Sequence, residues 1–280
     1  MTTSIVITGA TGFIGRALCK RLEEKKEFSI IKVTRSTKLK SGFCHVTSYQ
    51  KTPPGDILIH LGEDPDRSSV NKIGDKYRVK TGYIMESLLK KGYKNIIYCS
   101  SSVVYGDKGT EAYKEDMITF ANDTYSQAKL ENEKRILSSN GIVVRFSNVI
   151  GYGMSKNTVL QDILRQIPEK GSLKIFNTQP IKDFILIDDV VDAIINLINK
   201  DASGIFNIGS GVATSIYNLI ELVLDQNDQH GREIKSTITN PEYSYNVLNI
   251  DHIKKATGWK PKFTLSQSLK KCKILKKKKL

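Results

Sequence analysis

A tyrosine and a lysine four residues apart could together move a proton. Tyr125 and Lys129 lie in the segment YSQAK, within a stretch that predicts a helix over residues 123–139. Residues four apart project from one face of a helix. Tyrosine has an ordinary pKa of about 10, and a neighbouring ammonium favours its phenolate. The pair could therefore exchange a proton with a hydroxyl or carbonyl group, although this spacing is also common on plain exposed helix faces.

Three serines could hold the reacting oxygen beside that phenol. Ser100, Ser101 and Ser102 stand at the expected carboxyl end of an apolar strand, in IIYCSSSVVYG, about 24 residues before Tyr125. In parallel sheets the carboxyl ends of the strands form the edge at which ligands bind. Without the other motifs, the serines would only indicate the end of a strand.

Three glycines at intervals of three predict a dinucleotide-binding turn. Gly9, Gly12 and Gly15 follow the apolar segment SIVIT and open a predicted helix over residues 13–25. Glycine permits a tight turn and lets a phosphate reach backbone N–H groups, and the positive end of the helix faces the anion. A structural turn would fit the glycines alone, but their place at the first strand-to-helix junction favours a dinucleotide.

The second predicted strand ends in an arginine where an acid would bind the ribose 2′-hydroxyl of NAD. Arg35 lies at this position in KVTRST, and Arg16 directly follows the last glycine. An arginine at the strand end accommodates the 2′-phosphate of NADP. The sequence therefore favours NADP(H), with NAD(H) possible, although two solvated arginines would give the same pattern.

These groups must be positioned along one edge of a sheet. Short Ile- and Val-rich segments alternate with helix-length stretches up to residue 150, which is typical of parallel strands buried on both faces. We predict an α/β fold, a doubly wound parallel sheet of the Rossmann type with a smaller C-terminal substrate lobe. Residues 1–150 should form the dinucleotide-binding domain, to which residues 181–212 return. Residues 151–180 and 213–270 should form the lobe.

Composition limits the class of protein. The 280 residues are 39% hydrophobic, enough for a sizeable core. Half of the net charge of +14 comes from lysines at residues 270–280, so we expect residues 271–280 to be a solvated, disordered tail with at most a weak role in RNA or membrane binding. Four scattered cysteines indicate neither disulfides nor a metal site. Without an apolar spanning segment or signal peptide, we expect a cytoplasmic protein with no nucleic-acid or membrane partner.

The chain resembles the extended short-chain dehydrogenase/reductase family. Motifs of that family occur here in the family's order: TGATGFIG, DILIHLG, YCSSSVVYG, YSQAK, VVRFSNVIGYG, KDFILIDDVVDAI, FNIGSG and TGWKPKFTL. The resemblance implies an NAD(P)-dependent enzyme acting on a nucleotide sugar. It also implies a homodimer that pairs the helix before KNIIY with the Tyr125 helix. Ile84, Met85, Leu88 and Leu89 suit such a contact, although a core face would look the same.

The resemblance also implies roles for individual residues. Ser101 would be the catalytic hydroxyl, Tyr125 the acid/base, and Lys129 the group that lowers the pKa of the tyrosine and binds the nicotinamide ribose. The implied substrate-binding residues are Ser102, Asn148 and Lys182. The cofactor-binding residues are expected to be Gly9, Thr11, Gly12, Phe13, Ile14, Gly15, Arg16, Arg35, Leu61, Gly62, Ser100 and Phe146.

Three departures from the family pattern bear on the site. Glu63 follows His60-Leu61-Gly62 where relatives have HLAA, which places an acid near the path of the cofactor. Lys182 replaces an arginine, so that a point charge replaces a bidentate fork. The arginine of the later R-P-G-D motif has no counterpart near Thr239. We therefore expect diphosphate binding to be weaker or built differently.

The sequence leaves two enzymatic reactions open. Dehydratases of the family carry an Asp–Glu pair where this chain has Ser102 and Val103, so simple 4,6-dehydration is not expected. Arg35 and Arg16 favour the NADPH-dependent reduction of a keto-deoxy sugar nucleotide, and the alternative is an NAD(P)-dependent 4-epimerase. A non-catalytic nucleotide-binding or RNA-associated module is a third hypothesis, which the complete serine, tyrosine and lysine set disfavours.

Overall fold

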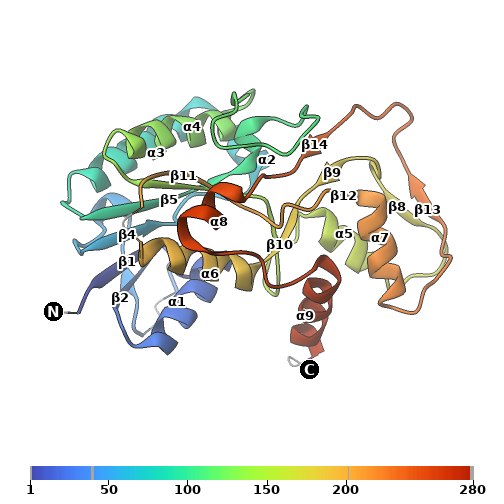
Figure 1. Ribbon diagram of the computed structural model, residues 1–280, viewed down its shortest axis with the longest axis horizontal. Coiled ribbons are helices and arrows are strands. Elements are labelled where there is room, and N and C mark those ends of the chain that lie inside the picture. The colour runs from blue at the N-terminus through green and yellow to red at the C-terminus, as the bar shows by residue number, and fades with distance from the viewer. Residues whose placement is uncertain (1, 39–40, 201, 278–280) are drawn as a thin grey trace.

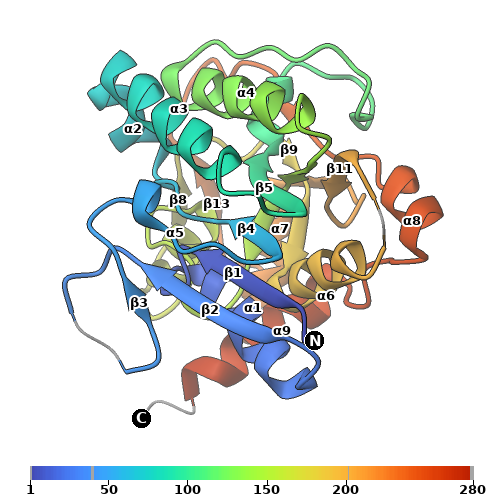
Figure 2. The same cartoon turned by 90° about the vertical axis from the view of Figure 1, so that its left-hand side faces the viewer.

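A seven-stranded parallel sheet forms the centre of the molecule's larger part (Figures 1 and 2). The computed structural model describes residues 2–38, 41–200 and 202–277. The strands are β1 (Ser4–Thr8), β2 (Ser29–Thr34), β3 (Cys44–His45), β4 (Ile57–His60), β5 (Asn95–Ser101), β6 (Ile142–Phe146) and β11 (Gly204–Ile208). Their order is β11-β6-β5-β4-β1-β2-β3, and every neighbouring pair is parallel. The direction of winding reverses between β1 and β4, where open sheets of this kind bind nucleotides.

Helices cover both faces of this sheet, as Figure 1 shows. One layer contains α1 (Phe13–Lys25) and α6 (Ile187–Ile198), and the other contains α2 (Arg67–Ile73), α3 (Asp75–Leu89) and α4 (Thr124–Leu137). In β1, Ile5 and Ile7 pack in the core cluster on the α1 side, and Val6 packs with the α3 side. Both faces of the strand are thus buried, which explains its continuous apolar sequence. The predicted doubly wound α/β fold is confirmed.

The smaller part begins where β6 ends, because the chain passes from Phe146 almost directly into β7 (Asn148–Ile150). Its other elements are α5 (Val159–Gln166), β8 (Leu173–Ile175), β9 (Ile181–Lys182), β10 (Phe184–Leu186), β12 (Thr214–Ser215), α7 (Ile216–Asp225), β13 (Ile234–Ser236) and β14 (Tyr245–Asn246). Leu160, Ile163, Leu173 and Leu219 belong to a second core cluster centred on α5 and α7. The exact limits of the two domains stay a prediction.

The C-terminal segment differs in part from the expected tail. After α8 (Asp251–Thr257), helix α9 runs over Leu265–Lys277. Lys271 forms an ion pair with Asp188 on α6, and its ammonium lies 4.0 Å from the centre of the Phe263 ring. Much of the segment predicted as a disordered tail is therefore helical, and residues 278–280 lie outside the described part of the chain. Among the described helices, none combines the length and apolar character that crossing a bilayer requires.

Candidate active site at the carboxyl edge of the sheet

The turn after β1 leaves room only for glycine at two of its positions. Gly9 has a φ of +69°, and a Cβ there would lie 2.5 Å from the carbonyl oxygen of Leu61. A Cβ on Gly15 would lie 2.2 Å from the carbonyl oxygen of Gly9, because α1 approaches the turn closely. Helix α1 starts at Phe13, and its N-cap residue Gly12 makes no side-chain hydrogen bond. Its first N–H groups thus suit a phosphate anion at the point where the winding reverses.

Other residues predicted at the cofactor lie close to this turn. The Thr11 hydroxyl is 2.8 Å from the Thr34 hydroxyl at the end of β2. Phe13 and Ile14 are partly buried against the main core cluster, and Phe146 is buried at the carboxyl end of β6. The turn after β1 therefore fits a dinucleotide, because the groups that surround it at the ends of β1, β2 and β4 are small side chains and backbone atoms.

Arg35 lies beside the turn and stacks on an aromatic side chain that sequence reasoning missed. Its Nη2 donates to the carbonyl oxygen of Gly62 at 3.2 Å, and its guanidinium lies 4.6 Å from the centre of the Tyr49 ring. The Tyr49 hydroxyl accepts the N–H of Gly9 at 3.1 Å. Tyr49 belongs to the short 3-10 helix η1 (Tyr49–Lys51), for which no motif gave a signal.

Arg16 does not join Arg35. A Cβ on Gly153 would lie 2.7 Å from Nη2 of Arg16, so this side chain reaches the loop after β7. The two arginines that favoured NADP(H) thus contact different parts of the structure, and Arg35 alone of the two stacks on Tyr49.

Helix α4 joins the predicted acid/base to the strand that carries the serines. Asp123 caps α4 by accepting the N–H of Ser126, in a reciprocal capping box that fixes the start of the helix. The Lys129 ammonium lies 5.8 Å from the centre of the Tyr125 ring and donates to the carbonyl oxygen of Cys99 at 2.8 Å. Ser101 is two residues further along β5. One lysine therefore links the tyrosine helix to the serine strand, a contact that the four-residue spacing of Tyr125 and Lys129 did not predict.

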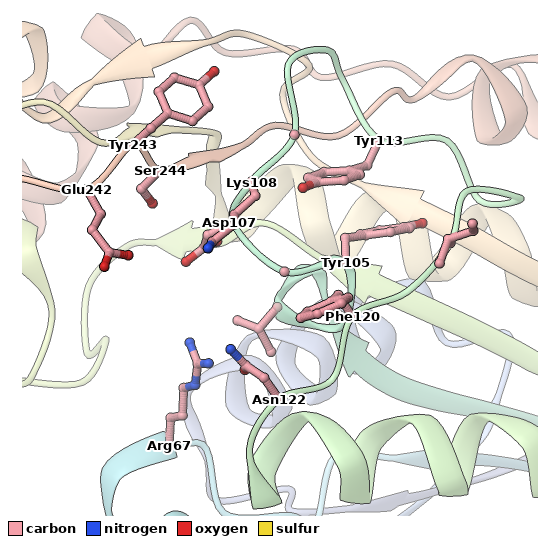
Figure 3. A pocket seen from close by; sticks show the side chains of 14 residues that line it. Arg67, Tyr105, Asp107, Lys108, Tyr113, Phe120, Asn122, Glu242, Tyr243 and Ser244 are labelled. Atoms are coloured by element: carbon pink, nitrogen blue, oxygen red, sulfur yellow. The ribbon is translucent and has the colours of Figure 1, made fainter.

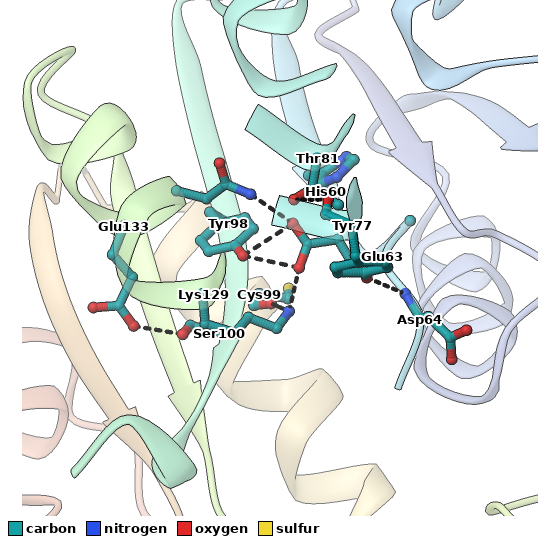
Figure 4. A network of polar contacts seen from close by, with 12 residues as sticks. His60, Glu63, Asp64, Tyr77, Thr81, Tyr98, Cys99, Ser100, Lys129 and Glu133 are labelled. Carbon is teal, nitrogen blue, oxygen red and sulfur yellow. Dashed lines mark hydrogen bonds and ion pairs between the residues drawn. The ribbon is translucent and has the colours of Figure 1, made fainter. Parts of the chain in front are cut away.

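Glu63 completes a buried network around Lys129 (Figure 4). Its carboxylate lies 2.8 Å from the Lys129 ammonium and accepts the Tyr98 hydroxyl and the Asn132 amide, each at 2.9 Å. Both charged side chains are only 7% exposed. Burial alone would raise the pKa of Glu63 and lower that of Lys129, but their attraction outweighs burial. The pKa of Glu63 thus lies below its ordinary value and that of Lys129 above, which keeps the ion pair charged at neutral pH.

Two of the three serines use their polar groups inside the fold. The Ser100 hydroxyl donates to Glu133, as Figure 4 shows. The Glu133 carboxylate is in turn paired with Arg145 at 2.6 Å. Ser102 is buried, and its carbonyl oxygen accepts the Asn246 amide. Of the three, Ser101 is the partly exposed one, and its hydroxyl caps the 3-10 helix η2 (Ser102–Tyr105). The Ser100 side chain predicted at the cofactor is therefore already engaged elsewhere, whereas Ser102, predicted at the substrate, is buried and uses its backbone carbonyl within the fold.

A cavity of about 560 Å³ opens just beyond η2 (Figure 3). Tyr105 and Tyr113 stack in its wall with their ring centres 4.8 Å apart. Arg67 and Asn122 enter from the α2 and α4 side, and Figure 3 shows them facing the gap below Asp107. The cavity therefore combines an aromatic wall with charged and amide groups, as a polar ring ligand requires.

A second cavity of about 540 Å³ lies in the smaller part, between β7, α5 and β8. Asn148 and Lys182, both predicted at the substrate, line it together with the exposed Phe176. The Lys182 ammonium also reaches Asp107 at 3.0 Å and Ser244 at 2.8 Å, which line the first cavity. Lys182 thus connects the two cavities.

The motifs that form this edge also match a known family. A model described as the NAD dependent epimerase/dehydratase family matches residues 5–209, well over half of the chain. The chain belongs to this family. Its membership confirms the resemblance found in the motifs and makes the protein an NAD(P)-dependent enzyme.

Two curated relatives of this epimerase/dehydratase family member span nearly the same length. This chain is 28% identical to GDP-6-deoxy-D-talose 4-dehydrogenase of Aggregatibacter actinomycetemcomitans, and the match covers 89% of this chain and 92% of the relative. It is 25% identical to GDP-6-deoxy-D-mannose reductase of Pseudomonas aeruginosa, covering 96% of each chain. The solved structure of RMD from Pseudomonas aeruginosa complexed with NADPH superposes with a TM-score of 0.87, at 23% identity and over 100% of both chains. That last likeness shows a shared fold.

Proposed function

We propose that the protein is an NADPH-dependent reductase of a keto-deoxy sugar nucleotide. One observation carries the proposal: a single sheet edge holds a tight glycine turn, an arginine at the end of β2 and a lysine that links Tyr125 to the strand of Ser101. The curated relatives, named as a deoxysugar-nucleotide dehydrogenase and a reductase, support the same substrate class.

In this proposal the chain supplies the proton and the cofactor supplies the hydride. Ser101 donates a hydrogen bond to the carbonyl oxygen of the substrate, and Tyr125 gives that oxygen its phenolic proton. The hydrogen bond from Lys129 to the Cys99 carbonyl fixes the position of the ammonium between α4 and β5. The same ammonium places a positive charge beside the Tyr125 phenol. The reduced product then bears a hydroxyl, and the phenol recovers its proton from water.

The two cavities divide the substrate between them. The cavity beyond η2, whose wall includes Val103 two residues after Ser101, would hold the sugar, and the apolar cavity with Phe176 would hold the nucleoside. Asn148 and Lys182 stand at the second cavity, where they would meet the diphosphate. Since Asp107 already pairs with Lys182, the positive charge available to the diphosphate is reduced.

Arg35→Ala is expected to raise the KM for NADPH by about 10- to 100-fold and to leave that for NADH within about threefold, because a hydrogen bond between charged groups contributes about 1.5–3 kcal/mol. Steady-state kinetics with both cofactors measures this. Arg21→Ala, which removes an α1 arginine paired with Asp192, is the matched control and should change neither KM. Equal losses for both cofactors in Arg35→Ala would refute the 2′-phosphate assignment.

A 4-epimerase is the second candidate, supported by the description of the matching family. An epimerase returns its hydride to the same substrate and so keeps its nicotinamide, whereas a reductase exchanges oxidised for reduced cofactor in every cycle. Mass spectrometry of the purified protein distinguishes them. We expect an empty site that takes up NADPH, and a nearly stoichiometric content of bound NAD would favour the epimerase.

We also propose a homodimer that pairs α3 and α4 with the same helices of a second copy. Ile84, Met85 and Leu88 are buried in the core, so these apolar residues of α3 do not form its outer face. That face instead carries Val79 and Tyr83, which are 56% and 61% exposed. Light scattering should give twice the chain mass, and Tyr83→Glu should halve it. A monomeric mass for the unaltered protein would refute the dimer.

A further inference from the structure

The ion pair between Glu63 and Lys129 gives Glu63 a role in the direction of proton transfer. We propose that Glu63 is a positioning residue that fixes the Lys129 ammonium and offsets its charge, so that the Tyr125 phenol serves as a proton donor. This inference rests on the proposed reductase function and deepens it, because a site that holds a proton is prepared for reduction rather than oxidation.

The hydrogen bonds of Lys129 support this role. An ammonium has three N–H donors. One is used by the Cys99 carbonyl and one by the Glu63 carboxylate, each at 2.8 Å. A single donor remains for the side of Tyr125 and the cofactor. The lysine is therefore held at a fixed place rather than free to follow the phenol.

Glu63 is itself held in place by neutral donors. The Tyr98 hydroxyl and the Asn132 amide bind its carboxylate from β5 and α4 (Figure 4). Neither group brings a charge, so the carboxylate's negative charge is directed at Lys129. An ammonium near a phenol stabilises the phenolate, and a carboxylate 2.8 Å from that ammonium cancels much of its effect.

The other titratable groups packed around the pair stay neutral near pH 7. From β4, burial lowers the pKa of His60 to about 4. From α3, burial raises the pKa of Tyr77. From β5, burial raises the pKa of Tyr98 well above its ordinary value and that of Cys99 to about 12.

The charged groups nearby already have partners of their own. Asp123 at the start of α4 pairs with Arg67, and Glu133 one turn after Lys129 pairs with Arg145. Arg35, at the end of β2, also contributes positive charge. Its effect is smaller than that of Lys129, as shown by how far each lowers the pKa of His60. Glu63 is thus the carboxylate that directly offsets Lys129.

The test is a titration of Tyr125 itself in the NADPH-bound protein. Carbon-13 at Cζ of the tyrosines reports the phenol by nuclear magnetic resonance, and the signal lost in Tyr125→Phe assigns it. In Glu63→Gln, which keeps the shape but removes the charge, the pH at which Tyr125 loses its proton should fall by about 1 or more. The matched control is Glu131→Gln, which removes a carboxylate from α4, the helix that carries Tyr125. This carboxylate pairs with Arg78 rather than Lys129, so its loss should leave that pH unchanged.

A second variant covers the case in which Glu63→Gln does not fold. Glu63→Asp keeps the charge but draws it back by one methylene, so the titration of Tyr125 should shift in the same direction by a smaller amount. An unchanged titration in the folded Gln variant, or in the Asp variant if the Gln variant does not fold, overturns the proposal. The alkaline limb of the reductive kcat profile should move with the titration.

The titration needs no sugar substrate, so it separates this inference from the proposed function. A shifted Tyr125 titration in a protein that reduces no keto sugar nucleotide would refute the reductase and leave the charge-offsetting role of Glu63 standing. Reductase activity with an unshifted titration would refute the role of Glu63 alone.

Discussion

Tyr125→Phe is expected to lower kcat by about 10²- to 10⁴-fold, the usual contribution of a positioned proton donor. The substitution removes only the hydroxyl, so the ring still packs against Val70, Tyr77 and Ala128. The hydrogen bond from the Tyr125 backbone N–H to Asn71 also remains. The Kd for NADPH should therefore stay within about threefold, as measured by fluorescence titration.

The matched control for this variant is Tyr83→Phe. Tyr83 is 61% exposed on the outer face of α3, and the loss of its hydroxyl should leave kcat unchanged. A kcat within about threefold of the unaltered enzyme in Tyr125→Phe would show that another group supplies the proton.

Lys129→Met is expected to abolish turnover and to reduce the free energy of unfolding by about 3–5 kcal/mol, because it leaves the Glu63 carboxylate buried without its counter-charge. The double variant Glu63→Gln/Lys129→Met should recover most of the stability but none of the activity. Chemical denaturation of the two single variants and the double variant measures the coupling. Lys94→Met is the control, since Lys94 is 81% exposed in its pair with Asp56 and should contribute about 1 kcal/mol or less.

The same pair sets a pH dependence of stability. The pKa of Glu63 is lower in the folded protein than its ordinary value, so its stabilisation is present at neutral pH and is lost as the pH falls through that lowered value.

Loss of activity in Lys129→Met without any loss of stability would contradict the buried ion pair.

Much of the fold followed from local patterns. Continuous Ile and Val runs predicted parallel strands, and these runs are buried because helices cover both faces of the sheet. The glycine spacing predicted a helix over residues 13–25, where α1 lies. The four-residue spacing of Tyr125 and Lys129 predicted one face of α4, and a helix of 3.6 residues per turn requires that result.

Contacts between distant elements could not be predicted in this way. Glu63 and Lys129 stand on different elements, and their pairing depends on how α4 packs across β5. Tyr49 reaches Gly9 from the short 3-10 helix η1 that follows the edge strand β3, and no spacing in the sequence indicates this contact. The Ser100 hydroxyl points away from Ser101 because neighbouring strand residues face opposite sides of a sheet. The alternation of side chains along a strand could be predicted from the sequence. The choice of Glu133 as the partner of the Ser100 hydroxyl could not.

The most direct test of the account follows the hydride. The protein is incubated with NADPH deuterated at both C4 positions and with GDP- or dTDP-linked 4-keto-6-deoxyhexoses. We expect one deuterium at the reduced sugar carbon for each NADPH oxidised, as seen by mass spectrometry and nuclear magnetic resonance. If no keto sugar nucleotide oxidises NADPH, or if tightly bound NAD interconverts two sugar nucleotides without net consumption of cofactor, the reductase assignment is wrong.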